Sequence, residues 1–214
     1  MNPIFNYING LKQALDGLSH EVIARVIDTL HEARLNNQQI FILGNGGSAS
    51  TATHFVCDLG KNTRVNGAPN FRVMGLTDNM ALFSALANDE GYDQVFSQQL
   101  ASHIRPGDVV IGISTSGNSQ NVINAIQLAN RVPAKTIGFT GFNSGQLGSM
   151  VDINLHVPSQ LIEHVEDLHL VLEHLVTKAL REKAMEPAVL GTPLSVQANA
   201  PTELSLGEGS SALG

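Results

Sequence analysis

His54 and Asp58 are the first residues whose types and spacing could do chemistry. They lie four positions apart in the segment ASTATHFVCDL, which is rich in small residues and can form a helix. Residues four apart on a helix project from one face, as paired metal ligands or acid–base partners must. Glu166 and His174 lie eight apart in a second helical segment, again near one face but separated by two turns. A helical histidine alone is more often packed or solvated, so this pattern needs further support.

Two loops rich in Gly, Ser, Thr and Asn could bind an anion. Each loop follows an apolar run and precedes a helical segment, so N–H groups, hydroxyls and the helix dipole would converge on a phosphate. Neither loop has the spacing of a dinucleotide fingerprint or the lysine of a P-loop. Ordinary strand-to-helix turns are the alternative, but two such loops at equivalent places favour binding. The loop residues expected to contact substrate are Asn45, Gly46, Gly47, Ser48, Ser114, Thr115, Ser116 and Ser119.

Five short apolar runs alternate with helical segments and would position these loops. The runs are 38–43, 71–76, 108–114, 135–140 and 152–157. This alternation predicts an α/β fold, a five-stranded parallel sheet with helices on both faces and right-handed crossovers. Ligands of such sheets bind beyond the carboxyl ends of the strands, where both loops are expected.

Further helices are predicted at both ends of the chain. Apolar spacing over residues 5–35 predicts two helices with a break near Gly17, and a long last helix is expected over 159–183. We divide the chain into N-terminal helices (1–36), an α/β domain (37–183) and a flexible tail (184–214) that lacks a sustained period. The first and last helices carry wide apolar stripes, which we expect to be buried between subunits.

Composition excludes several classes of function. The 214 residues are 43% hydrophobic, with a formal net charge of −7, which argues against a nucleic-acid partner that would need a basic face. No apolar stretch approaches the roughly 20 residues that cross a bilayer, so no membrane segment is expected. The single cysteine and the absence of a signal-peptide pattern predict a cytoplasmic protein.

Three segments together resemble a known family. GNGGSASTATHF, ANDEGYDQVFSQQL and GDVVIGISTSGNSQNVINAI are similar to the sugar isomerase (SIS) domain, in its phosphoheptose isomerase branch. The resemblance covers about residues 5–183. It implies an aldose–ketose isomerase for a phosphosugar such as sedoheptulose 7-phosphate, forming D-glycero-D-manno-heptose 7-phosphate through an enediol. It also implies a flavodoxin-like three-layer sandwich and a homotetramer with active sites between subunits.

The resemblance also assigns roles to individual residues. In the resembling isomerases, zinc is bound by a His and a Glu of the first helix after the glycine loop and by a Gln and a His of the last helix. These positions are occupied here by His54, Asp58, Glu166 and His174. We expect Asp58 and His174 to be the catalytic acid–base pair, with Asp58 as the base. Glu166 is also expected to contact substrate, and so are Asn88 and Asp89 in the ANDEG turn, which are otherwise ordinary turn formers.

Two alternatives stay open at this point. Asp58 and Glu166 depart from the family residues, and an Asp base is one methylene shorter than a Glu base, which could displace it by more than the ~0.5 Å that a productive site tolerates. The chain could therefore be an isomerase for another phosphosugar. It could instead be a non-catalytic phosphosugar-binding or partner-binding protein, since the DnaA initiator-associating protein also belongs to this branch. Two histidines and two acids at the metal positions favour the enzyme.

Overall fold

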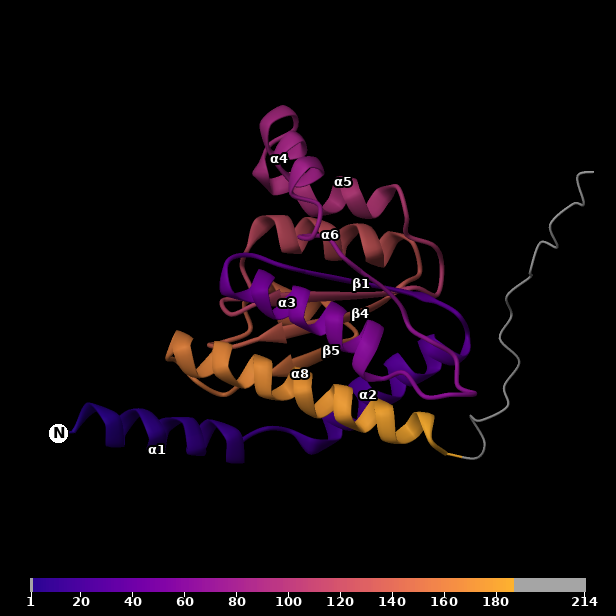
Figure 1. The fold of residues 1–214 in the computed structure, drawn as a ribbon. Helices are drawn as coiled ribbons and strands as arrows, with labels where there is room; N and C mark the ends of the chain where they lie inside the picture. The colour runs from indigo at the N-terminus through magenta and orange to yellow at the C-terminus, as the bar shows by residue number, and fades with distance from the viewer. Residues whose placement is uncertain (1, 187–214) are drawn as a thin grey trace, which may run out of the picture.

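The computed structural model describes residues 2–186, and its centre is one five-stranded parallel sheet (Figure 1). The strand order is β2-β1-β3-β4-β5. The strands are β1 Gln39–Gly44, β2 Arg72–Gly75, β3 Val109–Ser114, β4 Lys135–Thr140 and β5 Ile153–His156. All five apolar runs therefore form strands, and the predicted parallel sheet is confirmed.

The order of the strands brings the two glycine-rich loops together. The chain moves to one side of β1 to form β2 and to the other side to form β3, so the direction of winding reverses between β1 and β3. Gly44 at the end of β1 is in register with Ile113, one residue before the end of β3. Both loops thus leave the sheet side by side at its carboxyl edge, at the switch point where doubly wound sheets bind ligands.

Helices cover both faces of the sheet (Figure 1). One face carries α2 His20–Leu35, α3 Gly47–Cys57 and α8 Ile162–Ala184, whose apolar side chains include Leu30, Phe55 and Leu172 in one core cluster. The other face carries α5 Val95–Ala101, α6 Gln120–Arg131 and α7 Gly145–Met150, which pack a second cluster. Strand β3 is buried along its whole length, because both faces of the central sheet are covered.

The first helix, α1 Pro3–Asp16, extends away from the sheet (Figure 1). The Asn2 side chain accepts a hydrogen bond from the Ile4 N–H at its start, and Gly17 ends it, which confirms the expected break. Only Ala14 of this helix is buried, whereas Ile4 is 67% exposed and Phe5 is 63% exposed. The apolar stripe of α1 is therefore uncovered in a single chain.

The helices differ from the expected ones in several details. Helix α4 spans Met80–Asp89, and a short 3₁₀ turn, Tyr92–Gln94, leads into α5. A single π-helical turn, Asp58–Asn62, extends α3, and the six-residue α7 follows the GFNSG loop; neither was expected. No helix in residues 2–186 is both long enough and apolar enough to span a bilayer. The three-part division of the chain stays a prediction, and most of the expected tail lies outside the described residues.

Candidate active site

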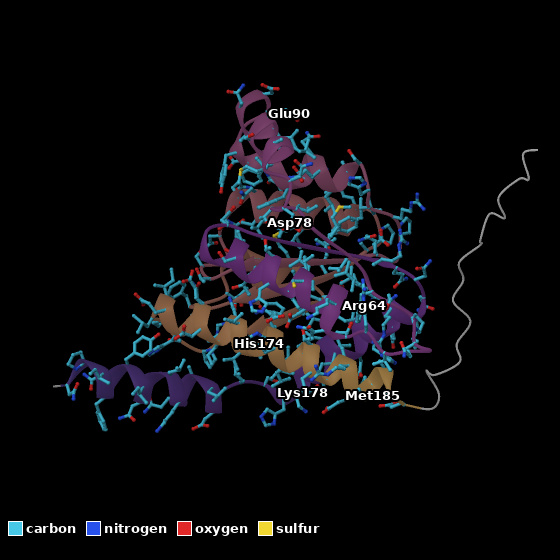
Figure 2. The ribbon with its side chains drawn as sticks, in the orientation of Figure 1. Arg64, Asp78, Glu90, His174, Lys178 and Met185 are labelled. Atoms are coloured by element: carbon cyan, nitrogen blue, oxygen red, sulfur yellow. The ribbon has the colours of Figure 1, made fainter. Side chains whose placement is uncertain are left out.

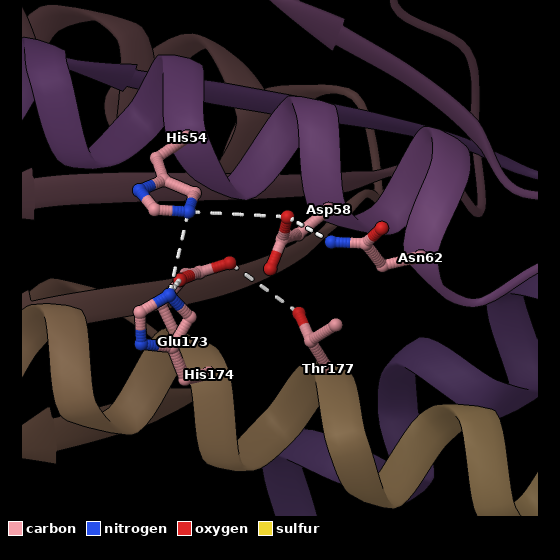
Figure 3. Close-up of polar contacts among 6 residues, drawn as sticks. All are labelled: His54, Asp58, Asn62, Glu173, His174 and Thr177. Atoms are coloured by element: carbon pink, nitrogen blue, oxygen red, sulfur yellow. Dashed lines mark hydrogen bonds and ion pairs between the residues drawn. The ribbon is translucent and has the colours of Figure 1, made fainter.

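Four side chains converge between α3 and α8 (Figure 3). His54 and Asp58 come from α3 and its π turn, and Glu173 and His174 come from α8. One nitrogen or oxygen atom from each residue lies within 4.8 Å of those from the other three. The expected association of His54, Asp58 and His174 is therefore present, and Glu173 joins them.

The local structure of α3 sets the positions of its two members. Gly46 begins the helix with a positive φ of 55°, which glycine adopts without strain, and the helix then carries His54 outward so that its side chain is 43% exposed. The helix widens into the π turn at Asp58, a feature that often occurs at functional sites. The Asp58 side chain is only 9% exposed and accepts a hydrogen bond from Asn62 Nδ2 at the end of that turn.

Glu173 is the buried member of the group. Its side chain is 0% exposed, and one carboxylate oxygen accepts a hydrogen bond from Thr177 Oγ1 at 3.4 Å. Burial raises the pKa of the Glu173 carboxyl to about 8, and the negative charge of Asp58 adds to the rise. A carboxylate so placed needs a nearby positive charge to stay ionised at neutral pH.

The set of donor atoms fits a divalent metal ion. Two imidazoles and two carboxylates are ligands that zinc accepts in tetrahedral protein sites. The Nε2 atoms of His54 and His174 face each other at 3.3 Å, and two neutral imidazoles can share only one proton across such a contact. A cation between these nitrogens and the carboxylates would satisfy all four groups together.

Glu166 lies elsewhere in the single chain, so the expected metal set of His54, Asp58, Glu166 and His174 is not assembled there. A Cβ atom added to Gly47 would lie 2.5 Å from Glu166 Oε1, which places this carboxylate at the start of α3. His174 is eight residues further along α8, about 12 Å along the helix axis. Glu166 therefore faces the first glycine loop, where contact with substrate was also expected, and the cluster lies two turns away.

The second loop, Ser114–Ser119, is held in a compact conformation. Ser114 Oγ and Ser119 Oγ lie 3.1 Å apart, and the backbone turns at Gly117 with a φ of 66°. The segment after β4 fixes the loop, because Gly141 N donates to the Thr115 carbonyl at 2.9 Å and Leu147 N donates to the Gly117 carbonyl at 2.9 Å. Ser116 Oγ accepts a hydrogen bond from Asn118 N at 3.2 Å, so the hydroxyls of this loop are already ordered.

The two loops are joined through Asn45. Its side-chain amide exchanges two hydrogen bonds with the buried side chain of Asn121, at 2.8 and 2.9 Å. Asn45 Oδ1 also accepts a hydrogen bond from the Tyr92 hydroxyl at 2.8 Å. The amide of Asn45 is thus engaged within the protein, whereas Ser48 lies buried in the first turn of α3. Asn45 positions the loops here, and its expected contact with substrate stays a prediction.

Asn88 and Asp89 lie far from the cluster in the single chain. They form the end of α4, next to Glu90, which lies at the top of the view, whereas His174 lies on α8 in its lower half (Figure 2). Both are exposed, and Asn88 Nδ2 donates to Asp89 Oδ1 at 2.7 Å. Their expected contact with the sugar stays a prediction.

The sequence reasoning missed Glu173, Tyr92 and Asn121. A signal for Glu173 was present, because His169, Glu173 and Thr177 follow one another at four-residue spacing within the apolar stripe that α8 buries. A charged residue in such a stripe is rarely there for packing alone. The hydrogen bonds of Tyr92 and Asn121 join loops that are distant in the sequence and gave no local signal.

Comparison with known proteins shows the family of the chain. The family model of the SIS domain matches residues 5–141. A phosphoheptose isomerase of Aliarcobacter butzleri is 40% identical over 177 residues, covering 76% of this chain and 92% of the relative. A phosphoheptose isomerase of Geotalea daltonii is 32% identical, covering 86% of this chain and 96% of the relative.

Solved structures of phosphoheptose isomerases share the fold of this chain. The phosphoheptose isomerase structure from Neisseria gonorrhoeae superposes with a TM-score of 0.76 and 30% identity, covering 84% of this chain and 95% of that one. The structure of a phosphoheptose isomerase from Francisella tularensis gives a TM-score of 0.77 and 28% identity, covering 84% and 96%. The chain therefore belongs to the SIS domain family, within the group that contains the phosphoheptose isomerases.

Proposed function

We propose that the protein is an aldose–ketose isomerase that converts sedoheptulose 7-phosphate to D-glycero-D-manno-heptose 7-phosphate. The observation that carries this proposal is the meeting of two histidines and two carboxylates beside α3, on an SIS fold whose glycine-rich loops share one sheet edge. The names of the similar proteins support the choice of a heptose phosphate as substrate. An isomerase for a different phosphosugar would use the same chemistry in a differently shaped pocket.

The phosphate is held by neutral donors. The second loop provides four hydroxyls, those of Ser114, Thr115, Ser116 and Ser119. This loop is already ordered by hydrogen bonds to the segment after β4. The N–H groups of Gly46 and Gly47 and the Ser48 hydroxyl, at the start of α3, contribute from the first loop. Because these N–H groups lie at a helix N-terminus, the helix dipole favours the dianion there.

The donor set fits zinc, for which His54 and His174 would supply nitrogen ligands and the carboxylates beside them would supply oxygen. When bound, this metal would polarise the carbonyl and hydroxyl oxygens of the substrate as a Lewis acid. An open hollow of about 570 Å³ borders His54, and its lining also includes Thr53, Cys57 and Thr77. Zinc is proposed from the chemistry of these ligands.

Asp58 and His174 carry the proton transfer in this proposal. Asp58 removes the proton from one sugar carbon and returns it to the neighbouring carbon, while His174 exchanges a proton at the adjacent oxygen. Asn62 donates to Asp58 and fixes the orientation of its carboxylate. The exposed side chain of His174 can reach a substrate that enters from solvent.

We also propose that the active protein is a homotetramer in the cytoplasm. The uncovered apolar residues of α1, together with Leu161, Ile162, Val171 and Leu175 on α8, support burial between subunits. A neighbouring subunit would also provide a route for Asn88 and Asp89 to reach the sugar. The cytoplasmic location stays a prediction from the single cysteine.

The proposal is tested by hydrogen exchange in heavy water. Metal-stripped protein is incubated with sedoheptulose 7-phosphate, with and without zinc. Replacement of hydrogen by deuterium at carbon 1 of the ketose and at carbon 2 of the aldose is followed by NMR. Zinc-dependent exchange and formation of the aldose are expected. Other ketose phosphates are tested in the same way. Exchange on one of them but not on sedoheptulose 7-phosphate would show that the enzyme acts on a different phosphosugar. Absence of exchange on all of them would contradict the proposed isomerase activity.

A further inference from the structure

We propose that Glu173 is a direct ligand of the divalent cation, together with His54 and His174, so that Asp58 remains available for proton transfer. This inference rests on the metal site of the proposed function. It differs from the ligand set expected from the resemblance, in which the acid of the last helix was Glu166.

Glu173 presents one unpartnered oxygen to the cluster. Its side chain is 0% exposed, and among residues 2–186 its Oε2 atom accepts no hydrogen bond. A buried polar atom without a partner is rare in folded proteins and calls for a missing ion, water or ligand. The other oxygen accepts from Thr177 Oγ1, which fixes the orientation of the carboxylate as residues behind metal ligands do.

The distances fit one small ion. Zinc binds nitrogen and oxygen at about 2.0–2.2 Å, so atoms at the corners of a tetrahedron around it are about 3.3–3.6 Å apart. Glu173 Oε2 lies 3.4 Å from His174 Nε2, which lies 3.3 Å from His54 Nε2. Asp58 Oδ1 is further out, 3.9 Å from His54 Nε2. The two imidazoles and Glu173 are thus spaced as ligands, and Asp58 lies at the margin.

The charges point to the same assignment. Asp58 and Glu173 are both buried, and two carboxylates in low dielectric repel each other unless a cation lies close. Two histidines are grouped with them in the described part of the chain, and the Nε2 atoms of these histidines already face each other. A divalent cation bound to Glu173 would compensate the charge of both acids while leaving the Asp58 carboxylate free for proton transfer.

Zinc affinity of the full-length protein tests this role directly. The dissociation constant is measured by competition with a chromophoric chelator for the wild type, Glu173→Gln and Glu163→Gln. Glutamine keeps the size of the side chain and removes its charge, and Glu163 is an exposed acid of the first turn of α8 that serves as the control. Loss of residues that support a ligand weakens binding about 10–100-fold, so loss of Glu173 is expected to weaken it at least 100-fold. The Glu163→Gln protein should match the wild type.

The possible outcomes distinguish failure of the ligand role of Glu173 from failure of the proposed isomerase activity. Wild-type affinity in Glu173→Gln, with a melting temperature in chelator that shows a folded protein, would overturn the inference even if hydrogen exchange with the heptose phosphate is present. If Glu173→Gln fails to fold, Glu173→Asp replaces it, since the shortened carboxylate should also lose affinity. A wild type that binds no zinc, cobalt or manganese would overturn both the ligand role and the metal site, while exchange measured without metal still tests the isomerase.

Discussion

His54 Nε2 lies 3.3 Å from His174 Nε2, although the two residues are separated by 120 positions in the sequence. Their rings meet edge to face, with centroids 4.9 Å apart. Both side chains are about half exposed, whereas the carboxylates beside them are buried. The imidazoles therefore form the solvent side of the cluster, and an ion entering from solvent would meet them first.

Zinc is expected to stabilise the protein through this pair. A ligand that binds only the folded state at 100 times its dissociation constant adds about 2.7 kcal/mol, or about 5–10 °C in melting temperature for a chain of this size. His54→Ala should lose the shift, because one nitrogen ligand is removed. His103→Ala, which changes an exposed histidine outside the cluster, should keep it. Thermal melts with chelator and with zinc make the comparison, and an equal shift in His54→Ala would contradict the site.

Asp58→Asn is expected to abolish turnover while phosphosugar binding survives. The amide has nearly the same shape but cannot accept the proton from carbon, and loss of a general base typically lowers the rate by about 10²–10⁴-fold. Hydrogen exchange in heavy water reports the rate, and calorimetry reports binding. Zinc content must be measured in the same sample, so that loss of base and loss of metal are distinguished. Undiminished turnover would show that Asp58 is not the general base.

The sheet could be predicted because each of its strands has a recognisable local sequence pattern. Each apolar run is bounded by turn residues, and the run at 108–114 is nearly continuous, as a central parallel strand must be. The short helix α7 has too few residues to show a period, and the π turn at Asp58 depends on packing against α8. The local sequence therefore predicts neither the helix α7 nor the π turn.

Part of the site could be predicted because two of its residues lie in one local segment. His54 and Asp58 lie on one helical segment, so their proximity follows from spacing. The choice between Glu166 and Glu173 depends on how α3 lies beside α8, with Gly47 near Glu166 and His54 near His174. Such an offset between two helices is set by tertiary packing and cannot be read from either segment alone.

Gly117→Ala is expected to disrupt the second loop more than its conformation alone requires. Gly117 and Gly91 both have positive φ, 66° and 95°, and such conformations cost a residue with a Cβ atom about 1–3 kcal/mol. A Cβ atom at Gly117 would also collide with the Ser144 carbonyl oxygen, whereas one at Gly91 meets nothing within 4 Å. Chemical unfolding should therefore show a larger loss of stability for Gly117→Ala than for Gly91→Ala, and phosphosugar binding should weaken in Gly117→Ala. Equal effects would show that the loop can move away from Ser144.

Stability should fall in acid through the titration of His169. This residue is 1% exposed, its Nε2 atom lies 3.2 Å from the Thr140 carbonyl oxygen, and burial lowers its pKa from 6.5 to about 4. The folded state binds the proton more weakly than the unfolded state, so the stabilisation is complete above pH 6.5 and is lost as the pH falls to 4. A shift of this size corresponds to a loss on the order of 3 kcal/mol.

His169→Gln tests this contribution, because glutamine can still donate to the Thr140 carbonyl but does not titrate. Urea unfolding in the presence of chelator, between pH 4 and 7.5, should give a shallower pH dependence for this variant than for the wild type. His103→Gln, in which an exposed histidine is changed in the same way, should follow the wild-type curve. Parallel curves for the wild type and His169→Gln would mean that the buried imidazole accepts its proton within the folded protein, with the Thr140 carbonyl holding the charged form.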